Sequence, residues 1–242
     1  MDKYISQLRN EIRFKRYSYQ TEKAYVGWVK RYLKFIHKMD IKGNYENKIR
    51  TFLNYLAESR NVSASTQNQA LCSLIFFYEQ ILNLEVGTLQ NLKYASKKSN
   101  LPVVLSEDEA WSVMRNLSGV KKLIVSLLYG SGLRISESLR LRVLDIDFDY
   151  QQIEVRNSKG NKDRVTILPQ SVINSLKHQV RKVVVLHKKD IDRGFGHVLL
   201  PNALSVKYPN ASSELKWQYL FPSRKIGKNP RTGFKHRYHQ SP

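Results

Sequence analysis

A helical spacing of apolar side chains recurs through residues 1–90 and constrains the fold more than any other feature. In residues 18–38, SYQTEKAYVGWVKRYLKFIHK, the apolar and aromatic side chains fall on one face of a helix. They are Tyr25, Trp28, Val29, Tyr32, Leu33 and Ile36. Ser18 is a candidate N-cap of this helix. Because residues 47–59 and 63–82 repeat the pattern, we expect residues 1–90 to form a four-helix domain with one small core.

Residues 102–242 mix helical and strand patterns, which predicts a second domain. Ser106 and Glu109 have the spacing of a capping box at a helix start. Residues 121–129, KKLIVSLLY, are apolar on most sides and predict a buried helix that Gly130 and Gly132 end, after which a new helix begins. The runs QIEVR and RVTILP flank the polar stretch NSKGNKD and predict a β-hairpin. We expect residues 224–242 to form a loop. The fold class is therefore mainly α with a small antiparallel β-sheet (α+β).

Between the two domains, residues 91–101 form a polar stretch that is followed by a proline. Lys93, Lys97 and Lys98 make this linker basic. Two interpretations stay open: an ordinary soluble loop, or a segment that crosses a phosphate backbone and contacts it through these lysines.

A strong excess of positive charge points to a polyanionic partner. The chain has 41 Lys and Arg against 20 Asp and Glu, a net charge of +21, and basic side chains are in excess in both domains. Such a charge costs stability by self-repulsion, and nucleic acid explains it better than an anionic membrane surface does. No apolar run approaches the roughly 18 residues of a membrane span, and the N-terminus lacks a signal peptide pattern, so we expect a cytoplasmic protein.

The cysteine and histidine positions predict no metal site. Cys72 is the single cysteine and falls on the apolar side of a helical pattern, which favours a buried thiol over a reactive one. The six histidines show no zinc-ligand spacing.

Two basic residues at element ends are candidates for phosphate chemistry. Arg134 follows the turn Gly-Ser-Gly-Leu, where one helix ends and another begins, so its guanidinium and the free N–H groups of the new helix could bind a phosphate. Lys159, in the turn of the predicted hairpin, could protonate a leaving oxygen. The alternatives are an ion pair between Arg134 and Glu137, one helical turn away, and a solvated turn lysine.

The two motifs together resemble those of a known family. LLYGSGLRISESLRLRVLDIDFD followed by IEVRNSKGNKDRVTILP looks like the first half of the catalytic domain of tyrosine site-specific recombinases, of the phage integrase family. Residues 1–90 look like the SAM-like core-binding domain of that family. Within it, residues 200–223, with YSYQTEKAYVGWVKRYLKFIH and NPRTGFKHRYH, are similar to the integron integrase subgroup.

The resemblance implies a function and a set of roles. Members cut one DNA strand at a time, hold the 3′-phosphate on a tyrosine and rejoin it to another strand, without metal, ATP or other cofactor. Arg134 would bind the phosphate, Lys159 would act as general acid and Glu137 would support them. The implied partners are DNA, as recombination sites of attI and attC type, and further copies of the full-length recombinase.

The sequence also departs from the family pattern. The resemblance implies a second arginine, His motifs and a nucleophilic tyrosine, and no residue among these 242 is assigned to them. Arg237, Tyr238 and His239 are poor substitutes because their motif lacks its structural context. We therefore expect a C-terminally truncated recombinase that binds DNA but is inactive, with an apolar face exposed around residues 121–130.

Several polar and aromatic residues are candidates for DNA contacts. Thr66, Gln67 and Asn68 stand near a helix start, where they are either groove-facing residues or ordinary cap and surface residues. Tyr208, Trp217 and Tyr219 could stack on extrahelical bases, although core packing explains Trp217 and Tyr219 equally well.

Two other functions are consistent with the charge. A non-catalytic helical DNA-binding or architectural protein accounts for the helices and the charge, but it leaves the Arg134 turn and the lysine hairpin unexplained. An RNA-binding protein accounts for the charge alone.

Overall fold

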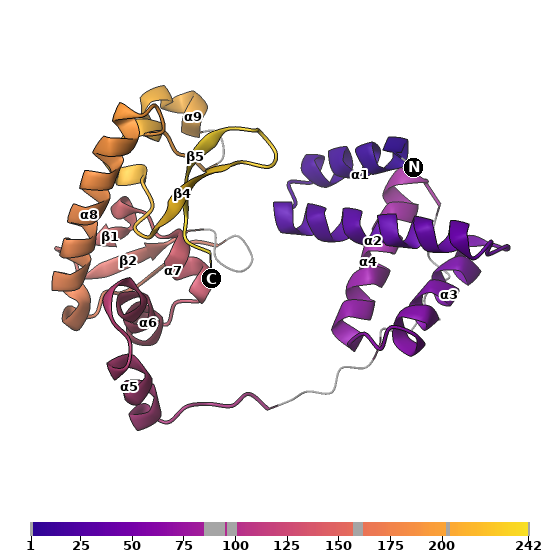
Figure 1. The fold of residues 1–242 in the computed structure, drawn as a ribbon, viewed down its shortest axis with the longest axis horizontal. Helices are drawn as coiled ribbons and strands as arrows, with labels where there is room; N and C mark the ends of the chain where they lie inside the picture. Colours follow the sequence, from indigo (N-terminus) through magenta and orange to yellow (C-terminus); the bar gives the residue numbers. More distant parts are fainter. Residues whose placement is uncertain (1, 85–94, 96–100, 157–161, 202–203, 242) are drawn as a thin grey trace. The chain divides into compact units, whose positions relative to one another are not determined.

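The chain folds as two compact units, Met1–Pro102 and Val103–Pro242 (Figure 1). The computed structural model describes residues 2–84, 95, 101–156, 162–201 and 204–241. Most of the predicted linker 91–101, with Lys93, Lys97 and Lys98, lies outside the described residues, and its role stays a prediction.

The described residues of the first unit form four helices: α1 (Asp2–Phe14), α2 (Tyr19–Lys38), α3 (Tyr45–Glu58) and α4 (Ala64–Ile81). Three of them begin at a side chain that accepts a hydrogen bond from the first turn: Ser18 at α2, Asn44 at α3 and Ser63 at α4. Such caps satisfy backbone N–H groups that have no partner within the helix. The predicted four-helix arrangement and the cap at Ser18 are confirmed.

The apolar faces of these helices meet in one aromatic core. Tyr32, Phe52 and Phe77 are among its fully buried side chains, and the Tyr32 and Tyr78 hydroxyls share a hydrogen bond of 2.6 Å. This bond satisfies two polar groups that would otherwise be costly to bury. Cys72 is half-buried.

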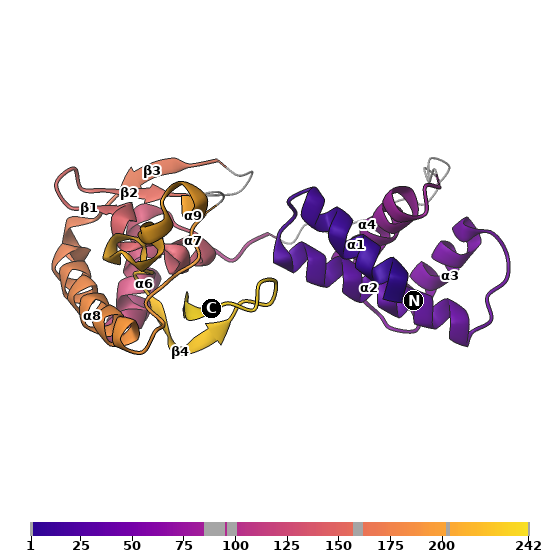
Figure 2. The same cartoon turned by 90° about the horizontal axis from the view of Figure 1, so that it is seen from above.

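The second unit combines five helices with two small sheets among its described residues (Figure 2). The helices are α5 (Glu107–Arg115), α6 (Gly119–Ser131), α7 (Ile135–Arg140), α8 (Ile173–Asp192) and α9 (Leu204–Lys207). The strands β1 (Ile146–Asp147), β2 (Gln152–Val155) and β3 (Arg164–Ile167) form an antiparallel sheet in that order, and β4 (Pro222–Lys228) pairs with β5 (Lys235–His239). The predicted fold class and the hairpin of β2 and β3 are confirmed. No helix in the described ranges has the length and apolarity to cross a bilayer.

The junction of α6 and α7 follows the predicted break in outline. Gly132 caps α6 in the left-handed conformation, with a φ of 62°, which glycine adopts without strain. Gly130 was expected to end the helix but lies within it, where a Cβ would stand 2.5 Å from Cγ of Pro169. Close packing against Pro169 is therefore the reason for a glycine at this position.

The apolar face around residues 121–130 is covered, contrary to expectation. Leu123, Ile124 and Leu127 are buried in a cluster with side chains from β2, α8 and the segment that leads into β4. Leu220 and Phe221, from that segment, are fully buried. The described residues of the second unit thus supply the cover for α6 themselves.

The expected loop at residues 224–242 is instead the hairpin of β4 and β5. Arg237 points inward from β5 and is buried, where it donates to both carboxylate oxygens of Asp190 on α8. It also donates to the carbonyls of Ser223 and Arg224, at 2.8 and 3.0 Å. The alternation of apolar and polar residues that predicts a strand is absent here, because a charged residue, Arg237, occupies one of the buried positions of the hairpin.

Protonation of His236 on β5 is expected to make stability depend on pH. Burial lowers the pKa of His236 below its ordinary value of 6.5, and the backbone of Phe234 only partly opposes this. The unfolded chain takes up a proton near pH 6.5 that the folded chain resists, so the free energy of unfolding falls as the pH drops below about 6.5. Burial also lowers the pKa of His239, which adds to the effect.

Urea denaturation at several pH values between 7.5 and 5.5 measures this dependence. His236→Phe should flatten it, whereas His178→Phe, at an exposed position on α8, should leave it unchanged. Equal slopes in the parent and in His236→Phe would show that His236 is not its source.

Candidate functional site

Arg134 stands at the boundary between the turn after α6 and the first residue of α7. Its backbone is extended, with φ −73° and ψ 151°, and its N–H donates to Oε2 of Glu137 at 2.9 Å. Its guanidinium donates to Oε1 of the same carboxylate at 2.7 Å. The side chain of Arg134 is nevertheless 56% exposed, whereas that of Glu137 is 6% exposed. The predicted ion pair therefore forms, and it leaves much of the guanidinium at the surface.

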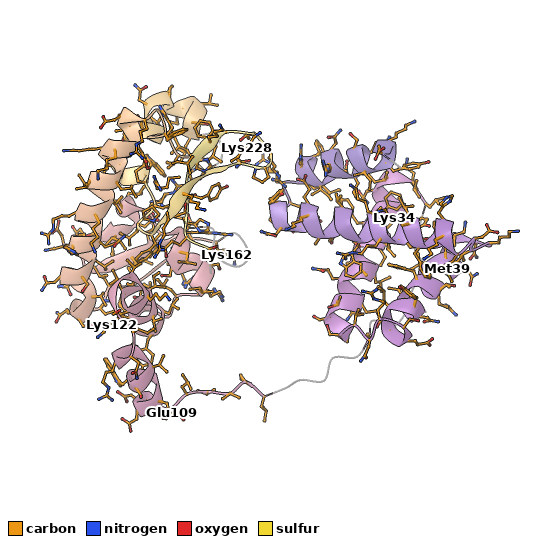
Figure 3. The ribbon with its side chains drawn as sticks, in the orientation of Figure 1. Lys34, Met39, Glu109, Lys122, Lys162 and Lys228 are labelled. Atoms are coloured by element: carbon orange, nitrogen blue, oxygen red, sulfur yellow. The ribbon has the colours of Figure 1, made fainter. Side chains whose placement is uncertain are left out.

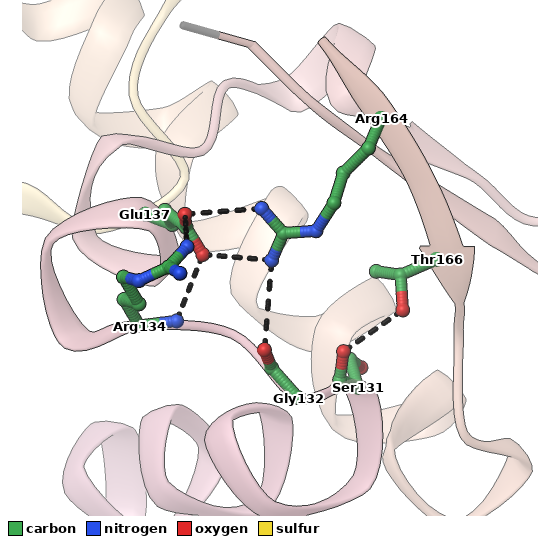
Figure 4. Close-up of polar contacts among 6 residues, drawn as sticks. All are labelled: Ser131, Gly132, Arg134, Glu137, Arg164 and Thr166. Carbon is green, nitrogen blue, oxygen red and sulfur yellow. Dashed lines mark hydrogen bonds and ion pairs between the residues drawn. The ribbon is translucent and has the colours of Figure 1, made fainter. Parts of the chain in front are cut away.

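A second arginine, which the sequence interpretation missed, completes this site. Arg164, the first residue of β3, donates Nη1 to Oε1 of Glu137 at 3.0 Å and Nη2 to Oε2 at 2.8 Å (Figure 4). This two-point geometry is the strong form of an arginine–carboxylate pair. One buried carboxylate thus holds two guanidinium groups that come from different elements.

Strand β3 is fixed to the same turn by a further contact. Thr166, two residues along the strand, donates its hydroxyl to the carbonyl of Ser131 at 2.8 Å (Figure 4). Residues two apart share a face of a strand. On β3 the polar residues Arg164 and Thr166 are half-buried, while Val165 and Ile167 are exposed. Arg164 and Thr166 therefore face the chain, although the alternation of polar and apolar residues along this strand would favour the opposite orientation.

The guanidinium groups of Arg134 and Arg164 meet at the carboxylate of Glu137. Two guanidinium groups face one carboxylate, and hydrogen bonding to Glu137 raises the pKa of Arg164. The exposed part of the Arg134 guanidinium carries its positive charge at the surface of this site. The N–H of Arg134 is bonded to Glu137, and that of Glu137 donates to the carbonyl of Arg134. A contribution of N–H groups at the start of α7 to anion binding stays a prediction.

Lys159, the other predicted catalytic residue, lies outside the described residues, between β2 and β3. The described strands pair in the register Val155 to Arg164. Its role as general acid stays a prediction. The part of the chain that the structure describes has no cluster of His, Cys, Asp or Glu that could hold a metal.

A cavity of about 270 Å³ adjoins Glu137 and is lined by Arg140, Arg142 and Arg156. Arg142 is buried and donates to the carbonyls of Trp217 and Leu199, at 2.5 and 2.8 Å. It thereby ties the segment between α8 and β4 to the end of α7. Trp217 is itself buried and packs with Val198 and Ala211, which agrees with the core-packing interpretation; stacking on bases stays a prediction.

The other predicted DNA contacts have mixed outcomes. Thr66 shares a hydrogen bond with the cap Ser63, Gln67 donates to the carbonyl of Leu53, and Asn68 pairs with the backbone of Ala95. All three therefore make local contacts, and a groove-facing role stays a prediction. Tyr208 is half exposed, and Lys207 Nζ lies 5.3 Å from its ring centre, so a stacking role stays a prediction.

Tyr238 and His239 line the cavity next to Glu137, but their rings are engaged within the chain. Tyr238 stacks on Tyr219 at 6.2 Å and accepts a hydrogen bond from Asn229 at 3.3 Å. Arg237 is committed to Asp190. The expectation that the three residues do not replace a catalytic cluster stays a prediction.

Comparisons with known proteins match both units. Residues 4–88 match the phage integrase N-terminal SAM-like domain, and residues 103–241 match the phage integrase family. Integrase/recombinase proteins of Escherichia coli and Pseudomonas aeruginosa are each 40% identical over 237 residues, covering 98% of this chain and 70% of theirs. Tyrosine recombinase XerA of Pyrococcus furiosus is 33% identical over 162 residues, covering 64% of this chain and 54% of the relative. A crystal structure of XerA recombinase matches at a TM-score of 0.33 and 29% identity, over 76% of this chain and 65% of that one.

A helical unit followed by an α+β unit, with an exposed arginine clamped beside a β-hairpin, is the arrangement expected of a tyrosine recombinase. The family matches agree with it, and this chain belongs to the phage integrase family.

Proposed function

We propose that this chain binds DNA recombination sites and supplies part of the strand-transfer site of an integron-type tyrosine recombinase. The observation that carries the proposal is the Glu137 clamp, which holds an exposed Arg134 at a fixed position beside the hairpin that contains Lys159. A rigid cation beside a hairpin turn suits a reaction in which phosphate charge must be stabilised. The family matches of both units support the same conclusion.

In the proposed reaction, Arg134 binds the non-bridging oxygens of the scissile phosphate. A tyrosine hydroxyl attacks phosphorus and releases its proton to water as the O–P bond forms. The bond from phosphorus to the 5′-oxygen breaks, and Lys159 donates the proton that this oxygen takes up. The resulting 3′-phosphotyrosine conserves the bond energy for rejoining. Glu137 and Arg164 act as positioning residues, because they hold Arg134 and the hairpin but need not touch the phosphate.

The nucleophilic tyrosine and the second arginine are not assigned to any of residues 1–242. A polypeptide of these residues alone is therefore proposed to bind DNA without forming a covalent adduct. The proposed substrates are attI and attC sites, on which several copies assemble in the cytoplasm. The exposed Tyr208 beside Lys207 supports a contact with unpaired bases.

DNA binding by the 242-residue polypeptide should be strongly dependent on salt. If about six phosphates are contacted, raising the salt from 50 to 200 mM weakens binding by roughly 10³-fold, because each contact releases condensed counterions. Fluorescence anisotropy with labelled duplex and hairpin DNA measures this effect. A nicked suicide substrate, analysed on a denaturing gel, should yield no protein–DNA adduct.

Two results would contradict the proposal. Tighter binding to duplex RNA than to either DNA would favour an RNA-binding function, and an adduct through any tyrosine of this polypeptide would refute the inactivity. Tyr238→Phe is the matched variant for locating such an adduct, because Tyr238 lines the cavity beside Glu137.

A further inference from the structure

An apolar groove with a basic rim lies between α2 and α3 of the first unit. Its volume is about 480 Å³. The apolar lining consists of Trp28, Phe35, Phe52, Tyr55, Leu56 and Val62. Arg31, Lys34, Lys38 and Arg60 also line it, and no carboxylate does. None of these four cations forms an ion pair with another described residue. Their charges are therefore unbalanced at the groove.

The aromatic rings of the groove are already engaged with neighbours. Phe35 and Tyr55 stack on each other at 4.7 Å, with an angle of 28° between the rings, and the Arg31 guanidinium lies 4.5 Å from the Trp28 ring centre. Because base recognition requires free ring faces, this groove is poorly suited to a nucleobase. It suits aliphatic side chains that enter between the rings, on a segment whose carboxylates meet the basic rim.

The chain itself contains one segment with this chemistry, residues 101–111, LPVVLSEDEAW. Leu101 is 94% exposed and Val103 is 95% exposed, and Val104 and Trp111 are also exposed. Glu107, Asp108 and Glu109 follow in the first turn of α5 and form the longest acidic run of a strongly basic chain. Figure 3 labels Lys34 on α2 and Glu109 on α5, the two elements concerned. Glu109 accepts a hydrogen bond from the N–H of Ser106, and Oε1 of Glu107 accepts one from Nε1 of Trp111 at 3.3 Å. Asp108 and the second carboxylate oxygen of Glu107 are therefore the acidic groups for the rim.

We propose that residues 101–111 of one copy dock in the α2–α3 groove of a second copy, and that the exchange is reciprocal. A two-fold pair gives each copy one donated and one received segment, so that both sets of exposed aliphatic side chains are buried. The acidic turn of α5 meets Lys34 and Lys38. The resulting dimer forms without DNA, and its test is therefore independent of the recombinase function.

Charge reversal tests this dimer. Two variants place like charges in both segment–groove contacts of the dimer: the groove variant Lys34→Glu/Lys38→Glu and the segment variant Glu107→Lys/Asp108→Lys. Each should therefore self-associate at least about ten-fold more weakly than the parent. An equimolar mixture of the two restores opposite charges in both contacts and should recover the dimer. Sedimentation velocity of the full chain without DNA, at 0.1 M salt, measures all of these states.

Matched controls separate this contact from net charge. Lys177→Glu/Lys182→Glu on α8 changes the total charge as much as the groove variant does, and Glu79→Lys/Asp149→Lys matches the segment variant; all four positions are exposed. Neither control should alter the dimer. Circular dichroism verifies that the variants are folded.

A fluorescein-labelled peptide of residues 101–116 provides a second measurement. It should bind the parent about ten-fold more tightly than a peptide in which Glu107 and Asp108 are lysine.

Several outcomes would overturn the proposal. If the parent stays monomeric at all concentrations, the exchange between two copies does not occur. This result would contradict the proposal even if the segment docks in the groove of its own copy. A mixture that does not recover association, or controls as damaging as the variants, has the same consequence. If the groove variant loses duplex DNA binding while self-association is unchanged, the groove is a DNA contact instead.

Discussion

Replacing Arg134 by alanine is expected to lower the rate of DNA cleavage by about 10³-fold, in a polypeptide that also carries a nucleophilic tyrosine. The guanidinium is fixed by Glu137 before the phosphate arrives, so its positive charge is present in the transition state without reorganisation. The measurement is the rate of covalent adduct formation with a nicked suicide substrate in single turnover. The polypeptide is this chain joined to the remaining portion of the Escherichia coli integrase/recombinase that is 40% identical to it.

Three further variants test whether the loss of cleavage is specific to the guanidinium of Arg134 and its contact with Glu137. Arg181→Ala, at an exposed position on α8, removes the same side chain elsewhere and should leave the rate unchanged. Arg134→Lys keeps the charge but loses the two-point geometry, so the rate should fall between those of the parent and the alanine variant. Glu137→Gln should slow cleavage without changing the salt dependence of DNA binding. Cleavage by Arg134→Ala within a few-fold of the parent would refute the assignment.

The sequence predicted those features that depend on residues close together in the chain. The caps at Ser18 and Ser106 form because a hydroxyl reaches N–H groups within the same turn. The pair of Arg134 and Glu137 spans one helical turn, and the left-handed Gly132 follows from a glycine at the end of an apolar run. In each case the local spacing alone brings the partners into contact.

The features that the sequence interpretation missed depend on partners far apart in the chain. Arg164 reaches Glu137 across 27 positions, and Arg142 reaches the carbonyl of Trp217 across 75. Nothing in the sequence near Arg164 or Arg142 distinguishes a buried, paired arginine from one that contacts DNA. A net charge of +21 makes this distinction harder, because most basic residues are explained by a polyanion before their partners are known.

Truncating Arg237 to alanine is expected to lower the free energy of unfolding of the second unit by about 3–5 kcal/mol. The substitution leaves the Asp190 carboxylate buried without its cation, and it leaves the carbonyls of Ser223 and Arg224 without the donor that now satisfies them. Hydrophobic contacts of β4 and β5 cannot compensate, since the cost comes from an unpaired buried charge. Urea denaturation of the full chain, followed by circular dichroism and fitted with one transition for each unit, measures the loss.

Two comparisons identify the buried pair as the cause. Lys235→Ala removes an exposed cation two residues away on the same strand and should change stability by no more than about 0.5 kcal/mol. The double variant Asp190→Ala/Arg237→Ala should be clearly less destabilised than the sum of its two single variants, because it leaves no charge buried alone. A loss in Arg237→Ala as small as that in Lys235→Ala would show that the pair does not hold the hairpin on α8, and it would make Arg237 available for DNA after all.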